Sequence, residues 1–175
     1  EEMARYTGVK NTCALSSGTA GLHLALRIAG VKSKDIVFCP SLTFAASANV
    51  ILYENAIPVF FDVHPSSWTI NPDILEQQIT KYNPKAIISV DLYGQSCDYE
   101  QISFICKKHD IILIEDAAES LGSEYLDKKC GSFGHMAVLS FNGNKIITTS
   151  GGGMLLSNNE DYISKAHFLS TQARE

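Results

Sequence analysis

The chain has 175 residues, 45% hydrophobic and 19% charged, a composition that excludes a disordered segment, a collagen and a disulfide-rich miniprotein. Its net charge of −5 at pH 7 offers no basic surface for nucleic acid or for an anionic membrane. No apolar run reaches the ~20 residues of a membrane span and the first residues are acidic, so we expect a cytoplasmic protein that binds small molecules.

Short apolar segments alternate with segments of helical periodicity along the chain. The apolar segments predict strands at 12–15, 36–39, 58–61, 86–90, 111–114, 137–141 and 154–156. The periodic segments predict helices at 19–29, 44–53, 72–81 and 99–109, the third with Asn71 as its N-cap. This alternation is typical of βα units, so the predicted fold class is α/β, a mainly parallel sheet with helices on both faces.

The two ends of the chain also have a helical pattern, around residues 2–6 and 162–169, and neither carries a stop signal. We therefore expect a fragment of a longer protein. The cysteines have neither CxxC spacing nor paired histidines nearby, which favours buried reduced thiols over disulfides or a zinc site.

Ligands of open α/β sheets bind beyond the carboxyl ends of the strands, so the residues after each predicted strand are candidates. The turn 16–21 contains Gly18 and Thr19 and leads directly into a helix, where free N–H groups could bind a phosphate. A simple helix cap is equally compatible with this turn. It matches neither GxGxxG nor the P-loop pattern, which disfavours a nicotinamide-dependent oxidoreductase.

Three more strand-end loops carry candidate side chains. Phe44 could cover a flat ring, although a lone Phe is more often part of the core. Asp116 and Glu119 follow an apolar strand and stand one helical turn apart, so they could face one cavity; Asp116 could instead cap a helix. Lys145 stands in a loop of neutral residues, where an amine loses proton affinity and can attack a carbonyl, unless it is an ordinary solvated lysine.

Together these loops would bring an anion site, an aromatic ring, a buried carboxylate and an amine into one cleft. Pyridoxal 5'-phosphate (PLP) needs this set: a phosphate cradle, a ring stack, an acid at the pyridine nitrogen and an amine for its aldehyde. The residues therefore favour PLP as the cofactor.

Four blocks of sequence resemble the DegT/DnrJ/EryC1/StrS family of PLP-dependent sugar aminotransferases. They are SGTA at 17–20, PSLTFAAS at 40–47, EDAAESLG at 115–122 and SFNGNK at 140–145, and they occur in the family's order. Within the family the chain most resembles the bacterial enzymes of the PglE type, which aminate C4 of UDP-4-keto-6-deoxy-N-acetylglucosamine.

The resemblance implies the large domain of the aspartate-aminotransferase fold and a role for each matching residue. Lys145 would bind the cofactor covalently and act in catalysis, Asp116 would pair with the pyridine nitrogen and Phe44 would stack on the ring. The phosphate would be held by residues of two turns, and Glu119 would lie near the phenolic oxygen. The phosphate ligands implied are Gly18, Thr19 and Ser140, with Asn142 assisting.

The resemblance also implies partners. Family members are homodimers about twice as long as this chain, so residues 1–175 would form the large domain without the C-terminal small domain. The substrates would be an amino-acid donor, such as glutamate, and a nucleotide-linked ketosugar. Two alternatives within the fold are a non-catalytic or regulatory cofactor-binding module and a dehydratase with histidine in place of the lysine; Lys145 argues against both.

Overall fold

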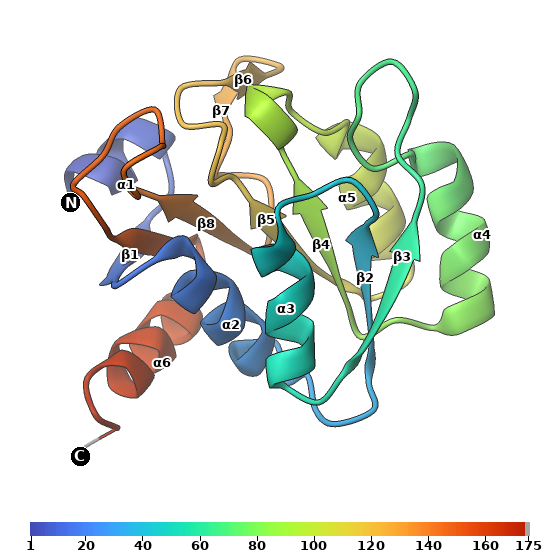
Figure 1. Ribbon diagram of the computed structural model, residues 1–175, viewed down its shortest axis with the longest axis horizontal. Helices are drawn as coiled ribbons and strands as arrows, with labels where there is room; N and C mark the ends of the chain where they lie inside the picture. Colours follow the sequence, from blue (N-terminus) through green and yellow to red (C-terminus); the bar gives the residue numbers. More distant parts are fainter. Residues whose placement is uncertain (174–175) are drawn as a thin grey trace.

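Seven strands form the central sheet, in the order β1-β9-β8-β5-β4-β2-β3 (Figure 1). The computed structural model describes residues 1–173. One strand, β9, runs opposite to the other six, so the predicted mainly parallel α/β sheet is confirmed. Each strand begins and ends within two residues of its predicted segment. The strands are β1 (Asn11–Leu15), β2 (Ile36–Pro40), β3 (Ile57–Phe61), β4 (Ala86–Val90), β5 (Ile112–Asp116), β8 (Met136–Ser140) and β9 (Gly153–Ser157).

Helices cover both faces of the sheet, as the sequence predicts. The helices are α1 (Glu2–Thr7), α2 (Gly18–Ile28), α3 (Ala45–Tyr53), α4 (Pro72–Tyr82), α5 (Tyr99–Lys108) and α6 (Glu160–Ser170), with a 3-10 turn, η1, at Leu92–Gly94. One face carries α2, α3 and α6, whereas α4 and α5 pack on the other (Figure 1). Asn71 caps α4 as predicted, since its Oδ1 accepts the N–H of Asp73 at 3.0 Å.

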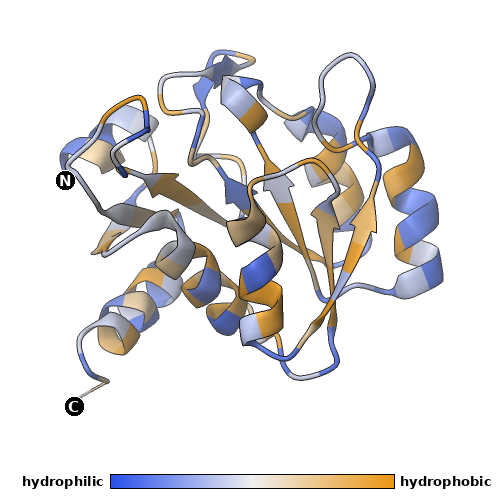
Figure 2. Cartoon of the chain, viewed as in Figure 1, coloured by the Kyte–Doolittle hydropathy of each residue, from blue (hydrophilic) through white to orange (hydrophobic). Residues whose placement is uncertain are grey.

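The strands are apolar on both sides because each faces a helical layer. In β2, Val37 and Cys39 pack toward α2 and α3, while Phe38 between them packs toward α4 and α5. Figure 2 shows this hydrophobic colouring along the strands at the centre of the molecule. All five cysteines are buried and unpaired, which confirms the predicted thiols. Within residues 1–173 no helix is long and apolar enough to cross a bilayer.

A small hairpin not predicted from the sequence lies at the carboxyl edge of the sheet (Figure 1). Its strands β6 (Glu124–Tyr125) and β7 (Lys128–Lys129) are two residues each and antiparallel. Segments this short have no measurable periodicity, which explains why the sequence pattern does not reveal them.

Gly153, at the start of β9, lies directly against the residues that precede α2. A Cβ atom built on Gly153 would overlap the backbone of Ser17 and of Gly18. Backbone atoms of a helix start cannot move aside as the end of a flexible side chain can. The site loop and the edge of the sheet therefore fit together only because residue 153 has no side chain.

We predict that Gly153→Ala in the full-length protein lowers the free energy of unfolding by about 3 kcal/mol, because the methyl group overpacks this contact. The matched control is Gly151→Ala, since a Cβ at Gly151 meets nothing within 4 Å. Urea unfolding of both variants measures the difference. Equal midpoints for the two variants would contradict the close approach.

Candidate active site

A cavity of about 310 Å³ opens at the carboxyl ends of the parallel strands. All the residues that the sequence predicts for the site line this cavity. They are Gly18, Thr19, Phe44, Asp116, Glu119, Ser140, Asn142 and Lys145. Four separate segments supply them, so the cavity exists only because the sheet brings the ends of β1, β2, β5 and β8, and the loops that follow them, to one edge.

The amino end of α2 forms one wall of the cavity. Ser17 is the N-cap, and its Oγ accepts the N–H of Ala20 at 3.1 Å. Gly18 and Thr19 follow in the first turn and line the cavity, where the positive end of the helix dipole favours an anion. A Cβ on Gly18 would lie 3.0 Å from the Cβ of Ser140, so the two turns meet closely. The capping and anion-binding interpretations are thus compatible, because different residues carry them.

Asp116 lies at the end of β5 and is 6% exposed. Its Oδ2 accepts the hydroxyl of Ser47 at 2.7 Å, and its Oδ1 accepts the N–H of Ala118 at 3.2 Å. Burial raises the pKa of Asp116 to about 6. Both donors are neutral, so a cation placed in the cavity beside this carboxylate would stabilise its charged form. Sequence reasoning did not assign Ser47, although it stands in the same block as Phe44.

Asp116 and Glu119 both reach the cavity, but not from a helix. The segment 117–123 after β5 consists of turns, so the predicted helical spacing is wrong, as is the alternative that Asp116 caps a helix. Gly122, with φ of 102°, has a left-handed backbone that ends any helical path. The N–H of Ser120 instead binds the carbonyl of Ala117 at 3.2 Å in a tight turn.

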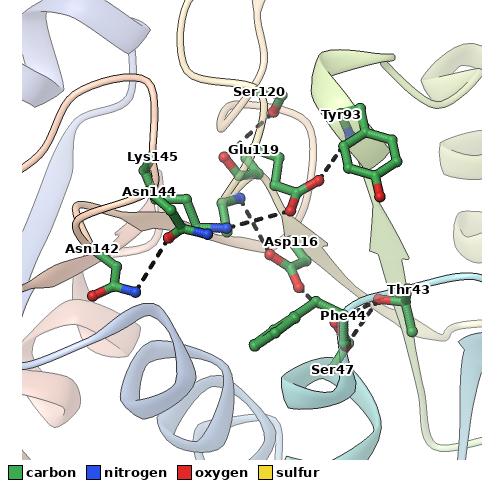
Figure 3. Close-up of polar contacts among 12 residues, drawn as sticks. Thr43, Phe44, Ser47, Tyr93, Asp116, Glu119, Ser120, Asn142, Asn144 and Lys145 are labelled. Atoms are coloured by element: carbon green, nitrogen blue, oxygen red, sulfur yellow. Dashed lines mark hydrogen bonds and ion pairs between the residues drawn. The ribbon is translucent and has the colours of Figure 1, made fainter.

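Lys145 has a charged neighbour, which the sequence did not predict. Its Nζ lies 3.4 Å from Oε1 of Glu119, and the Oε2 of the same carboxylate accepts the N–H of Tyr93 at 2.8 Å (Figure 3). The expectation of purely neutral surroundings is wrong because Glu119 comes from another loop, 26 residues away. With 13% of its side chain exposed, Lys145 is not an ordinary solvated lysine.

Phe44 lies at the mouth of the cavity as the N-cap residue of α3. It is 67% exposed, which rules out the core interpretation. The Nζ of Lys145 is 5.9 Å from the centre of its ring. An aromatic face beside the amine, and above the buried end of β5, is suitable for covering a flat ligand.

Two buried carboxylates lie behind the cavity. Asp91 directly follows β4. It is fully buried, and accepts hydrogen bonds from the hydroxyl of Tyr99 at 2.8 Å, the N–H of Cys97 at 3.0 Å and the hydroxyl of Ser120 at 3.0 Å. Asp91 therefore holds the loop after β4 against the turn that carries Glu119.

Glu115 is the second of these carboxylates and binds the hairpin segment instead. Its carboxylate accepts the backbone N–H groups of Gly131, Phe133 and Gly134. Burial, and then the charge of Asp91, raise the pKa of Glu115 to about 8. Alternation along β5 directs Glu115 away from the cavity and Asp116 toward it. The two adjacent acids therefore find their partners on opposite faces of the sheet.

The raised pKa of Glu115 predicts a pH dependence of stability. The folded protein keeps this proton up to about pH 8, whereas an ordinary Glu releases it near 4.5. The free energy of unfolding should therefore fall as the pH rises through this window, by at most about 1.4 kcal/mol per pH unit. Urea unfolding of the full-length protein from pH 5 to 8 measures the slope. Glu115→Gln cannot titrate and should reduce the slope, leaving the part that the raised pKa of Asp116 contributes; an unchanged slope would refute the assignment.

Comparison with known proteins places this geometry in a family. A model of the DegT/DnrJ/EryC1/StrS aminotransferase family matches residues 1–175. EpsN of Bacillus subtilis, provisionally named a pyridoxal phosphate-dependent aminotransferase, is 54% identical over 100% of this chain and 46% of its own length. GDP-perosamine synthase of Caulobacter vibrioides is 45% identical over 98% of the chain and 46% of its own.

A third relative is named for a UDP-linked sugar. The UDP-4-amino-4,6-dideoxy-N-acetyl-beta-L-altrosamine transaminase of Campylobacter jejuni is 42% identical over 97% of the chain and 45% of its own. Among solved structures, a protein of Streptococcus pneumoniae provisionally named a sugar aminotransferase, in its PLP form, superposes with a TM-score of 0.90 at 32% identity, covering 97% of this chain and 48% of that one. The chain spans about half the length of the curated relatives it matches.

Proposed function

The chain belongs to the DegT/DnrJ/EryC1/StrS aminotransferase family, and we propose that it is the cofactor-binding domain of a nucleotide-sugar aminotransferase. The enzyme would use PLP to move an amino group from an amino acid to the keto carbon of a nucleotide-linked deoxysugar. The observation that carries this proposal is the meeting of Lys145, Asp116 and the amino end of α2 in one cavity.

The residues of the cavity fit PLP. The amino end of α2, with Ser140 beside it, suits the phosphate, and Asn142 lies next to that turn. The carboxylate of Asp116 has two neutral donors, so a protonated ring nitrogen would be a suitable partner. Phe44 offers an aromatic face and Lys145 an amine. When bound, PLP supplies an aldehyde that takes up amino groups and a ring that accepts electrons.

Lys145, Asp116 and Glu119 would have different roles in amino transfer. Lys145 would hold the cofactor through its amine, and the same amine, when free, would take a proton from the donor's α-carbon. In the second half-reaction the same amine returns a proton to the carbon that receives the amino group. The carboxylate of Asp116 would hold the ring nitrogen of the cofactor in its protonated form. Glu119 contacts the amine at 3.4 Å and so limits its positions.

For the acceptor we propose a UDP-linked 4-keto-6-deoxy-N-acetylhexosamine, aminated at C4, with glutamate as the donor. The relative named as a transaminase of a UDP-linked 4-amino-4,6-dideoxy sugar supports this choice. The relative named GDP-perosamine synthase makes a GDP-linked sugar the alternative acceptor. We further propose that a C-terminal small domain beyond residue 175 and a second subunit complete the cleft.

The test is to incubate the full-length protein with PLP, glutamate and UDP-, GDP- and dTDP-linked 4-ketosugars, and to identify the products by mass spectrometry and NMR. We expect an amine at C4 of the UDP-sugar and a dimeric mass by light scattering. Amination of none of these ketosugars, with another carbonyl compound accepted instead, would refute the proposed function. Preference for the GDP-sugar would refute only the choice of nucleotide.

A further inference from the structure

Tyr93 is an exposed aromatic residue beside the cavity. It lies in η1, in the loop that follows β4, and 80% of its surface is exposed. Among residues 1–173 its hydroxyl has no hydrogen-bond partner and its ring no aromatic partner. The residue before it, Leu92, lines the cavity, so Tyr93 stands at the rim. A large exposed ring at this place does not contribute to the core.

The backbone of Tyr93 is held in an unfavourable conformation. Its φ of 53° and ψ of 27° lie in the left-handed region, which a bulky side chain rarely adopts. Hydrogen bonds on both sides maintain it: the N–H of Tyr93 donates to Glu119 at 2.8 Å, and the carbonyl of Gly94 accepts the hydroxyl of Ser123 at 2.7 Å. Residues with a strained backbone are often found at functional sites, so the strained backbone of Tyr93 is consistent with a functional role for its side chain.

Glu119 links the backbone of Tyr93 to the reactive amine. One carboxylate, that of Glu119, contacts the amine of Lys145 through Oε1 and the N–H of Tyr93 through Oε2. Figure 3 shows Tyr93 on one side of this pair and Asn142 on the other. If the phosphate occupies the side of Asn142 and the amino end of α2, a large substrate has to extend toward Tyr93.

We propose that the ring of Tyr93 contacts the hexose of the acceptor sugar nucleotide and fixes it beside Lys145. This inference rests on the proposed function. A hexose whose keto carbon lies at the amine of Lys145 also lies next to Glu119. The carboxylate of Glu119 binds the backbone of Tyr93, so such a hexose would be close to the Tyr93 ring. Sugars present C–H faces that pack against aromatic rings, whereas the smaller amino-acid donor does not need this contact. Tyr93 therefore acts on the second half-reaction and not on the first.

The experiment replaces Tyr93 with Asn and with Phe in the full-length holoenzyme. Asn tolerates the left-handed backbone and retains the N–H that binds Glu119, so Tyr93→Asn removes only the ring. The control Phe104→Asn removes a 69% exposed aromatic residue from α5. Steady-state kinetics give KM and kcat for the ketosugar, absorbance gives the rate of cofactor amination by glutamate, and calorimetry gives the Kd of the aminated sugar nucleotide.

We expect Tyr93→Asn to raise the ketosugar KM and the product Kd roughly tenfold, with the rate of the glutamate half-reaction unchanged. Tyr93→Phe should stay within about threefold of the wild type, and Phe104→Asn should change nothing. A wild-type enzyme that reacts with glutamate and ketosugar, combined with an unchanged KM in Tyr93→Asn, would overturn the role of Tyr93 alone. Loss of the dimer in Tyr93→Asn would instead make Tyr93 a subunit contact and would also overturn it. No reaction of the wild type with glutamate would refute the proposed function itself.

Discussion

Lys145→Ala is expected to abolish amino transfer in the full-length enzyme, with a loss of at least ~10³-fold in kcat, because the residue supplies both the attachment of the cofactor and the proton-transferring amine. The visible absorption band of the lysine-bound cofactor should vanish with it. Absorption spectra of the reconstituted variant and single-turnover rates with glutamate measure the two effects.

The alanine variant also leaves Glu119 without its cationic neighbour, so a second variant separates chemistry from structure. Lys145→Arg retains a positive charge beside Glu119 but has no amine that can attack an aldehyde, and should be as inactive as Lys145→Ala. Lys165→Ala, at an exposed position on α6, serves as the control and should behave as the wild type. An active Lys145→Arg would refute the catalytic role.

The same experiment decides the alternative of a non-catalytic or regulatory module. Such a module would bind PLP in the wild-type protein without transferring an amino group, and Lys145→Ala would then change the spectrum but no rate. If the wild type transfers amino groups and Lys145→Ala does not, the non-catalytic module is excluded.

Asp116→Asn should leave cofactor binding detectable but slow amino transfer roughly 100-fold. A neutral amide cannot hold the ring nitrogen in its protonated form, and one charge-assisted hydrogen bond is worth about 2–3 kcal/mol. The shape of the site should persist, because the amide oxygen can still accept the hydroxyl of Ser47. Single-turnover kinetics with glutamate, and with α-deuterated glutamate to isolate the proton transfer, measure the effect.

The matched control for this variant is Asp62→Asn. Asp62 also follows a parallel strand, β3, but is exposed and outside the cavity. It should transfer amino groups at the wild-type rate. A second variant, Ser47→Ala, removes one neutral donor from Asp116 and should slow the reaction by roughly tenfold at most. Normal rates in Asp116→Asn would remove the argument that this carboxylate makes the ring an electron acceptor.

Local sequence determined the seven strands of the central sheet, its covering helices and the position of each site loop. Each strand of the central sheet is a short apolar run because both of its faces are buried, and the candidate residues stand at the end of such a run or in the loop after it. The predicted set from Gly18 to Lys145 therefore lines one cavity. The α/β class and the mainly parallel sheet followed from the same alternation, because a parallel sheet needs a crossover after each strand.

Contacts between loops were decided only by the tertiary structure. The pairing of Lys145 with Glu119, the bond from Ser47 to Asp116 and the burial of Asp91 depend on the strand order, which places β5 between β8 and β4. The need for glycine at 153 likewise depends on how β9 meets α2. A sequence pattern reports what a residue's neighbours along the chain require, whereas these contacts join residues far apart in the chain, and the packing of the sheet alone sets which of them meet.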